Sequence, residues 1–504
     1  MRLGVDFGTT RTTVAAATRG NYPIVTFEDG VGDVHEYIPS VAALDGDHLV
    51  FGFAAQRLAL DGAPHVRSFK RHLSDPAVTT ATTIRLAGRD IGVVDLLTTF
   101  LAHVAQEVRA SSSLSELDPS EPLEAVVGIP AHAHSGQRFL TLEAFRNAGW
   151  SVLSMVNEPS AAGFEYTHRH SSTLNSKRTT VLVYDLGGGT FDASLVSAQG
   201  RAHEVLASRG HNMLGGDDFD LVLAQCVARA AGRSPKDYGE ATWARLIESC
   251  RPAKESLNAN SRYVTVEVKG QPVTVPVADF YEAATPLIQA TIDTMAPLLA
   301  KGPGGSLRLG DDVAGLYVVG GGAELPAVAR MLRADHGRRV HRSPHAPAST
   351  AIGLAIAADP NAGYTITDTL SRGVGVFRET DSGGQVSFDP LLTPDLRLDH
   401  ANGASVARRY RAAHNIGWFR FVEYSHTDEG GVPRGDVLPY GEVIMPFDPH
   451  LQNETVNLAN VPVIRTENGP LVEERYTVDS NGIVEVTITD LETGYTLSVG
   501  LGGR

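Results

Sequence analysis

The sequence contains very little cysteine. Only two cysteines, Cys226 and Cys250, occur among its 504 residues, and each lies in a stretch with helical periodicity. A disulfide framework needs several cysteines, so this pair predicts none and favours a reducing compartment. We therefore expect two small buried hydrophobic residues and a cytoplasmic protein.

Long apolar runs and an excess of basic residues are also missing. No segment approaches the run of roughly 18 apolar residues that a membrane-spanning helix needs, and the N-terminal MRLGVD lacks the layout of a secretory signal. The formal net charge is −15, whereas binding to nucleic acid or anionic lipid depends on clustered lysine and arginine. We expect neither a nucleic acid nor a membrane as partner.

Two common nucleotide-binding loops are absent as well. No GxxxxGK[ST] motif occurs, and the triple glycine from Gly187 to Gly189 leads into a strand, which excludes a Walker loop and a Rossmann loop. The sequence instead repeats one unit. RLGVDFGTTRTTVAAA (2–17) and VLVYDLGGGTFDASLV (181–196) each have an apolar strand, an aspartate, a glycine turn with threonine and a second strand. Hairpins about 180 residues apart predict duplicated lobes facing each other across a cleft.

The length of the chain predicts more than one hydrophobic core. Strand and helix patterns alternate up to residue 360, and alternating strands with Gly, Pro and Asn turns follow. We predict one domain over 1–360 and a β-rich domain over 361–504, in which Asn481-Gly482 joins a hairpin at 474–489. Further expected elements are strands at 124–130 and 314–319, a hairpin at 263–277, and helices at 135–150, 217–231, 241–257, 280–299, 326–334 and 350–358.

Both repeated units carry residues that suit nucleotide chemistry. Glycines let backbone N–H groups approach phosphates, hydroxyls contact terminal oxygens, and carboxylates hold Mg²⁺ through its waters. Asp6 precedes Gly8-Thr9-Thr10, and Asp185 precedes Gly187-Gly188-Gly189-Thr190. One unit alone is explained equally well by a plain hairpin with a glycine turn. The pair predicts a two-sided phosphate clamp in which two carboxylates face one metal ion.

Six motifs together resemble those of one protein family. They are GVDFGTT (4–10), SFKRHL (68–73), VNEPSAA (156–162), YDLGGGTFD (184–192), GGDDFD (215–220) and VVGGGAELP (318–326). Over residues 1–357 the chain resembles the seventy-kilodalton heat-shock chaperones of the DnaK type. The resemblance implies an α/β fold, an actin-like ATPase with duplicated ribonuclease-H-like lobes, followed by a β-sandwich domain.

The resemblance implies catalytic and metal-binding roles. Lys70 places an ammonium beside the γ-phosphate and the attacking water, Glu158 orients that water, and Thr190 contacts the γ-phosphate. Asp185 belongs to the same catalytic set, and Asp6, Asp185 and Asp192 organise Mg²⁺ and a monovalent cation such as K⁺. Periodicity alone describes Lys70 as a solvated surface lysine, and the position of Glu158 before Pro159 also suits a carboxylate at a helix start.

Binding of ATP and ADP is implied for residues of every loop. These are Gly8, Thr9, Thr10, Gly187, Gly188, Gly189, Thr190, Gly215, Gly216, Asp217, Lys254, Asn258, Gly320, Gly321 and Gly322. Pro130 and Arg138 match a proline and an arginine that relay the nucleotide state to the second domain. A proline that ends a strand is equally a plain strand breaker.

Three positions depart from the family pattern. Glu324 stands where the family usually has an arginine that stacks on adenine. Arg251 replaces a glutamate close to Lys254, and Ala348 replaces an acidic residue near the base. Phosphate and metal chemistry therefore look intact, whereas recognition of the base looks rewritten.

The second domain resembles a peptide-binding β-sandwich, chiefly through TVDSNGIVEVTITDLETG (477–494). No helical lid and no acidic, leucine-rich linker can be recognised, so we expect a lidless, divergent member. The resemblance implies a slow ATPase whose nucleotide state is coupled to binding of an extended polypeptide or one dedicated protein partner, with J-domain and nucleotide-exchange cochaperones. The alternatives are a small-molecule kinase and an assembly scaffold of the actin type.

Overall fold

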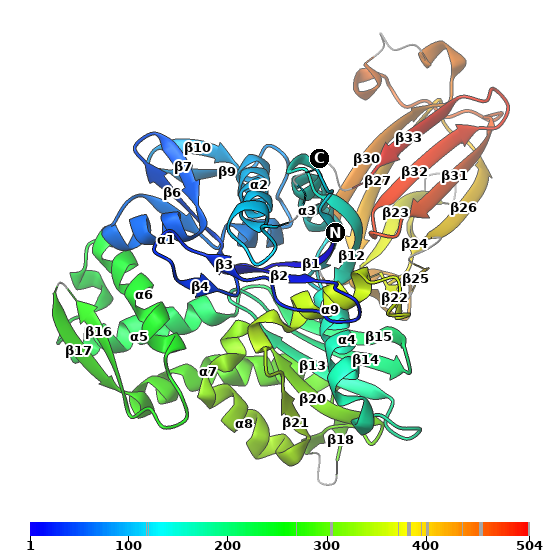
Figure 1. Cartoon of the computed structure of the whole chain (residues 1–504). Coiled ribbons are helices and arrows are strands. Elements are labelled where there is room, and N and C mark those ends of the chain that lie inside the picture. Colours follow the sequence, from blue (N-terminus) through cyan, green and yellow to red (C-terminus); the bar gives the residue numbers. More distant parts are fainter. Residues whose placement is uncertain are drawn as a thin grey trace. The chain divides into compact units, whose positions relative to one another are not determined.

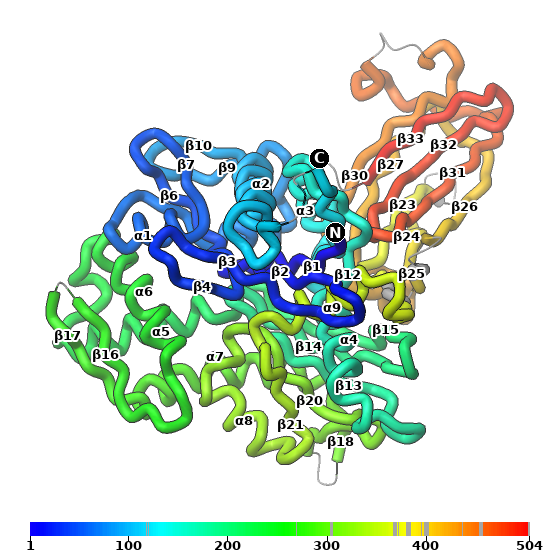
Figure 2. The backbone as a smooth tube through the Cα atoms, in the orientation of Figure 1, coloured from blue at the N-terminus to red at the C-terminus, as the bar shows by residue number. Residues whose placement is uncertain are grey.

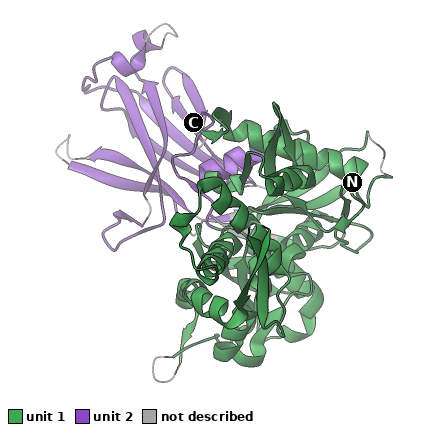
Figure 3. Ribbon diagram, turned by 90° about the vertical axis from the view of Figure 1, so that its left-hand side faces the viewer, with its two compact units in different colours: residues 1–72, 82–131, 143–366 green, residues 73–81, 132–142, 367–504 purple. Residues whose placement is uncertain are grey.

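The chain forms two compact units in the computed structural model (Figure 3). The structure describes residues 1–116, 118, 120–268, 270–302, 306–370, 372–380, 385–394, 396–399, 403–435, 437–452 and 457–501. Unit 1 comprises Met1–His72, Thr82–Ala131 and Glu143–Ile366, and unit 2 comprises Leu73–Ala81, His132–Leu142 and Thr367–Arg504. The compact units thus divide at 366 and 367, six residues beyond the predicted boundary, and unit 2 also includes two short segments from earlier in the chain.

The first sheet of unit 1 is built around the N-terminal hairpin (Figure 1). Its order is β12 (Ser151–Asn157), β11 (Glu124–Ile129), β1 (Arg2–Phe7), β2 (Arg11–Ala16) and β5 (Ile38–Pro39). β1 is antiparallel to β2 and parallel to β11, which is parallel to β12. Strands buried on both faces read as apolar runs, which is the pattern of residues 3–5 in β1 and 125–129 in β11.

The second sheet of unit 1 repeats this plan (Figure 2). Within unit 1 its order is β21 (Val340–Arg342), β20 (Val313–Val319), β13 (Thr180–Leu186), β14 (Phe191–Gln199) and β15 (Ala202–His211). Again a hairpin, β13–β14, has a parallel neighbour, β20, which pairs in parallel with β21. The predicted duplication of the hairpin units is confirmed.

Two helices join the repeated halves through close backbone contacts. α4 (Glu158–His170) packs against α9 (Ser349–Ala358), and α9 also packs against β1. A Cβ atom at Gly353 would overlap Ala161 O, and one at Gly4 would overlap Ala355 N. The two elements can therefore approach α9 this closely only because both positions are glycine.

The remaining elements of unit 1 surround the two sheets. Helices α5 (Gly216–Ala230), α6 (Glu240–Glu255), α7 (Val277–Met295) and α8 (Pro326–His336) share a hydrophobic core with β13 and β20. α1 (Gly52–Asp61) packs on a sheet of β7 (His48–Phe51), β6 (Val41–Asp45) and β8 (His65–Arg67). α2 (Val93–Ala110) follows a hairpin, and α3 (Ser135–Asn147) begins in unit 2 and ends in unit 1. Short strand pairs are β3 (Phe27–Glu28) with β4 (Val34–His35), β9 (Thr83–Leu86) with β10 (Arg89–Gly92), β16 (Tyr263–Val268) with β17 (Gln271–Pro276), and β18 (Ala300–Lys301) with β19 (Leu307–Arg308).

Unit 2 contains two four-stranded antiparallel sheets that share one core. One has the order β24 (Gln385–Leu392), β23 (Gly373–Thr380), β27 (Ile416–Tyr424) and β30 (Leu438–Pro446). The other has the order β26 (Ala404–Arg411), β31 (Leu471–Val478), β32 (Val484–Asp490) and β33 (Thr496–Gly500). Buried residues of both sheets, such as Phe421 and Tyr476, belong to one hydrophobic cluster. β22 (Thr365–Thr369), whose residues are divided between the two units, pairs with β25 (Arg397–Asp399). β28 (His426–Thr427) pairs with β29 (Pro433–Arg434).

The local predictions agree well with this fold. The hairpin at Asn481-Gly482 joins β31 to β32, and Gly482 has the left-handed φ of 76° that the turn requires. Cys226 and Cys250 are free and buried, as expected. Among the described residues, no helix combines the length and the apolar character that a membrane span needs.

Candidate functional site

The turn between β1 and β2 is held in place by Ser40, which directly follows the neighbouring strand β5. Ser40 donates from its N–H to Thr10 O at 3.0 Å and from its hydroxyl to Gly8 O at 3.0 Å. These bonds occupy the carbonyls of the turn. Asp6, the last residue but one of β1, lies immediately before it and is half-buried.

The turn between β13 and β14 is held by the N-terminus of α5. Gly187 N donates to Thr190 O at 3.0 Å, which closes the turn. Gly216 N donates to Gly187 O at 2.9 Å, and Asp217 N donates to Gly188 O at 2.8 Å. A Cβ atom at Gly215 would lie only 2.6 Å from Gly188 O, so this contact requires a glycine.

The two turns lie against each other. A Cβ atom at Gly189 would lie 2.6 Å from Thr9 Cγ2, and one at Gly188 would overlap the side chain of Thr10. The third glycine loop, Gly320-Gly321-Gly322, joins the second turn, because a Cβ atom at Gly322 would lie 2.7 Å from Gly187 O. The structure therefore brings all three predicted loops of the candidate nucleotide site together.

Lys70 is buried, with 4% of its side chain exposed. Its Nζ lies 3.3 Å from Glu158 Oε1 and 5.3 Å from the centroid of the Phe7 ring. The interpretation of Lys70 as a surface lysine is therefore wrong. Glu158 is indeed the first residue of α4, and its carboxylate faces this lysine.

Three aspartates beside this pair have raised pKa values: Asp192 is buried, whereas Asp6 and Asp185 are partly exposed. Burial, and then the carboxylate of Glu158, raise the pKa of Asp6 to about 7 and that of Asp192 to about 8, against the lowering effect of Lys70. Burial, Glu158 and Asp6 hold the pKa of Asp185 well above its ordinary range. Asp185 and Asp192 are direct cross-strand partners in β13 and β14. The ammonium of Lys70 thus lies close enough to these carboxyl groups to lower their pKa values, while Glu158 raises them.

The carboxyl oxygens are suitable donors for a hard cation. Asp192 Oδ1 is buried and has no hydrogen-bond partner among the described residues, which is costly unless a further group binds there. No three His, Cys, Asp or Glu side chains of the described part of the chain converge tightly enough to hold an ion directly. Mg²⁺ keeps several waters and takes few protein ligands. The residues therefore fit a magnesium ion bound through water.

A network of charged side chains covers the second turn. Arg71 donates to Gly189 O at 2.9 Å and pairs with Asp218 at 3.2 Å. Lys254 Nζ donates to Gly216 O at 2.7 Å, and Ser68 Oγ donates to Asp217 at 2.6 Å. The backbone of the turn is thereby fixed by side chains from both halves of unit 1.

Arg251, the unusual residue of α6, bridges two acidic side chains in this network. Its guanidinium lies 2.7 Å from Asp217 and 3.1 Å from Asp220. Burial alone would lower the pKa of Arg251, but these two carboxylates raise it above the ordinary value. Arg251 therefore holds the GGDDFD segment to the helix that carries Lys254.

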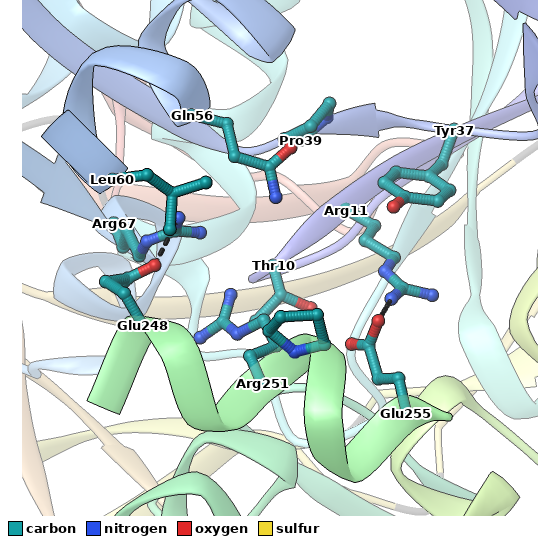
Figure 4. Close-up of a pocket in the computed structure, with 11 residues that line it drawn as sticks. Thr10, Arg11, Tyr37, Pro39, Gln56, Leu60, Arg67, Glu248, Arg251 and Glu255 are labelled. Atoms are coloured by element: carbon teal, nitrogen blue, oxygen red, sulfur yellow. Dashed lines mark ion pairs between the residues drawn. The ribbon is translucent and has the colours of Figure 1, made fainter. Parts of the chain in front are cut away.

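Sequence reasoning missed the charged groups that line a small cavity containing Thr10 of the first turn (Figure 4). A cavity of about 100 Å³ is lined by residues that include Thr10, Tyr37 and Arg251. Two ion pairs cross it: Arg11 with Glu255, and Arg67 with Glu248. None of these four residues lies in one of the six motifs. Arg67 directly precedes SFKRHL, and the two glutamates lie in the same helix as Lys254.

Four other positions singled out in the sequence, Asn258, Ala348, Pro130 and Arg138, lie outside the cluster around Lys70. Asn258 lines a second cavity together with Glu324. Ala348 does not line it and is buried in an apolar cluster with Phe164. Pro130 belongs to unit 1, whereas Arg138 belongs to unit 2 and lies near Gly482 of the same unit. The relay role of Pro130 and Arg138 stays a prediction.

Two hairpins of the same plan, whose glycine turns lie against each other beside acidic side chains, define a protein built from duplicated units. The family model described as Hsp70 protein matches residues 2–371, and the chain belongs to the Hsp70 family. Members of this family are ATP-binding chaperones with actin-like ATPase lobes and a β-sandwich, and the mixed α/β structure of this chain is consistent with that plan.

Proposed function

We propose that this chain hydrolyses ATP slowly between the two halves of unit 1 and that the nucleotide state controls polypeptide binding by the C-terminal β domain. The observation that carries the proposal is the ion pair of the buried Lys70 with Glu158, beside three aspartates with raised pKa values and two facing glycine turns. A structural ion pair alone has no need of so many uncompensated carboxyl groups.

Phosphoryl transfer to water needs positioning and electrostatic stabilisation rather than covalent chemistry. The glycine turns bring backbone close to the phosphates, and the hydroxyls of Thr9, Thr10 and Thr190 contact terminal oxygens. Mg²⁺, when bound through the aspartates, supplies positive charge next to the phosphates, and K⁺ is a candidate for a second cation.

Lys70 and Glu158 have different roles in the proposed reaction. Lys70 places its ammonium where negative charge develops on the transferred phosphoryl group. Glu158 accepts a hydrogen bond from the attacking water and orients it. Because both side chains are packed against the ends of β1 and α4, their geometry is set before the substrate binds.

The β domain is the proposed site for an extended polypeptide or for one dedicated protein partner. Its two sheets have outer strands, including β24 and β26 among the described residues, and such strands accept an added extended segment through backbone hydrogen bonds. J-domain and nucleotide-exchange cochaperones, relay through Pro130 and Arg138, and a cytoplasmic location all belong to this proposal.

The test is the rate of phosphate release by the full chain with Mg-ATP, with and without an extended hydrophobic peptide. A slow rate that rises with peptide supports a chaperone cycle. A rate that ignores the peptide contradicts the coupling and leaves an ATPase, and the absence of any hydrolysis contradicts the proposed activity itself.

A further inference from the structure

A second, larger cavity adjoins the candidate phosphate site. It has a volume of about 530 Å³, and its lining includes Glu255, Asn258, Tyr281, Glu324 and Arg342. All of these residues belong to unit 1. The cavity is neither the Lys70 centre nor the smaller cavity beside Arg251, although Glu255 lines both cavities.

Two residues that line the cavity are close sequence neighbours of residues that contact the second phosphate turn. Lys254 donates to Gly216 O at 2.7 Å, and the next residue, Glu255, lines the cavity. Gly322 packs against Gly187 O, and Glu324, two residues later, lines the cavity as well. A nucleotide whose phosphates lie on the turns therefore has this cavity as the adjacent space for its base.

Two of the polar residues that line the cavity form an ion pair. Arg342 Nη2 donates to Glu324 Oε1 at 3.0 Å, and both side chains are exposed. The described residues give Glu324 Oε2 no partner. The cavity therefore offers guanidinium donors next to carboxylate acceptors, on exposed side chains that can change rotamer to meet a ligand. Arg330, by contrast, already lies over the ring of Tyr281, 5.2 Å from its centroid.

The two purine bases differ in the hydrogen bonds of their edges. Guanine presents the acceptors O6 and N7 beside the donors N1–H and N2–H₂, whereas adenine presents the donor N6–H₂ beside ring-nitrogen acceptors. Guanidinium groups suit the O6 and N7 of guanine, and a carboxylate accepts from both guanine donors or from adenine N6–H₂. An Arg–Glu pair thus offers hydrogen-bond partners to either base. Rejection of one base would need a contact that is unfavourable for that base alone.

We propose that this nucleotide site takes guanine nucleotides as well as adenine nucleotides, with Glu324 reading the guanine donors. The inference rests on the proposed function, because it assumes that a nucleotide binds with its phosphates on the glycine turns. It adds a second class of substrate to that site.

The experiment is calorimetric titration of the full chain with Mg-ADP and with Mg-GDP. We expect the two dissociation constants to agree within about tenfold, or roughly 1.4 kcal/mol. Glu324→Gln removes one of the two acceptors for the guanine donors, so it should weaken GDP binding about tenfold while leaving ADP binding nearly unchanged. Glu267→Gln, on an exposed position of β16, is the matched control and should change neither constant.

The outcomes separate the two proposals. ADP binding more than about a hundredfold tighter than GDP binding overturns the dual use of bases and leaves the proposed ATPase standing. Equal loss of ADP and GDP binding in Glu324→Gln, or no loss at all, overturns the assignment of Glu324. Failure of the unaltered chain to bind either nucleotide instead overturns the proposed function.

Discussion

The ion pair between Arg67 and Glu248, in the smaller cavity, allows a quantitative prediction about the stability of the protein. Arg67 ends β8 and Glu248 lies in α6, and their side chains are only 11% and 7% exposed. Burial lowers the pKa of Arg67 and raises that of Glu248, in each case against the opposing effect of the partner. The pair is therefore costly to bury and still more costly to break.

Arg67→Ala leaves the Glu248 carboxylate buried without its main partner. Breaking a buried pair in this way costs about 3–5 kcal/mol. Arg251 also lowers the pKa of Glu248 and offers partial compensation, which favours the lower end of that range. The Arg11–Glu255 pair crosses the same cavity but is 22% and 39% exposed, so Arg11→Ala should cost no more than about 1 kcal/mol.

Urea unfolding followed by tryptophan fluorescence measures the difference. With a slope of about 3 kcal/mol per molar, Arg67→Ala should lower the midpoint by about 1 M and Arg11→Ala by about 0.3 M or less. The double variant Arg67→Ala/Glu248→Ala should be less destabilised than the sum of its single variants, because no unpaired charge remains. Equal midpoints for the two arginine variants, or strict additivity in the double variant, would refute the reasoning.

Three further predictions concern pH and packing. His203 is buried against Phe164, and burial lowers its pKa from 6.5 to about 4. Between these two pH values the unfolded state binds a proton at His203 that the folded state does not bind, so stability is lost as pH falls from about 6.5 toward 4. His203→Gln should reduce this loss in melting curves recorded at acidic pH. For Asp192 the pH dependence has the opposite sign, because its pKa of about 8 means that the folded state keeps a proton that the unfolded state has released. The stability of the metal-free protein therefore falls as pH rises from about 4 to 8. Asp192→Asn should raise the melting temperature at pH 8 and lower the hydrolysis rate, and an unchanged melting temperature would contradict the buried charge. Gly353→Ala forces a Cβ atom into Ala161 O and should destabilise the chain by about 1–3 kcal/mol. A loss of soluble, cooperatively melting protein would agree with this prediction. A melting curve identical to that of the unaltered chain would contradict it.

Much of the fold follows from local sequence patterns. The repeated hairpins could be predicted because apolar strands and glycine turns are short-range signals. Helix ends were less accurate. The helix expected at 135–150 ends at Asn147, because Gly149 adopts a left-handed φ of 84°. The helix expected at 280–299 runs from Val277 to Met295, where Pro297 helps to tighten the last turn into a short 3₁₀ segment.

The candidate site was predictable only in part. Residues in glycine-rich or motif segments, such as Asp6, Lys70 and Thr190, could be found because their sequence context is distinctive. Arg11, Arg67 and Glu248 could not, since their partners lie far away in the chain and come together only through tertiary packing. The burial that sets the acidity of Asp192 is likewise a property of the packed interior, which no local pattern records.

The central claim is that Lys70 acts in phosphoryl transfer at this site. The most direct measurement is single-turnover phosphate release from Mg-ATP by the full chain, by Lys70→Ala and by the exposed control Lys236→Ala, with ATP binding measured in parallel. Loss of one preorganised positive group at the transition state predicts a rate about 10²–10³-fold lower for Lys70→Ala, with nucleotide still bound and with Lys236→Ala unchanged. A Lys70→Ala rate equal to that of the unaltered chain would contradict the account.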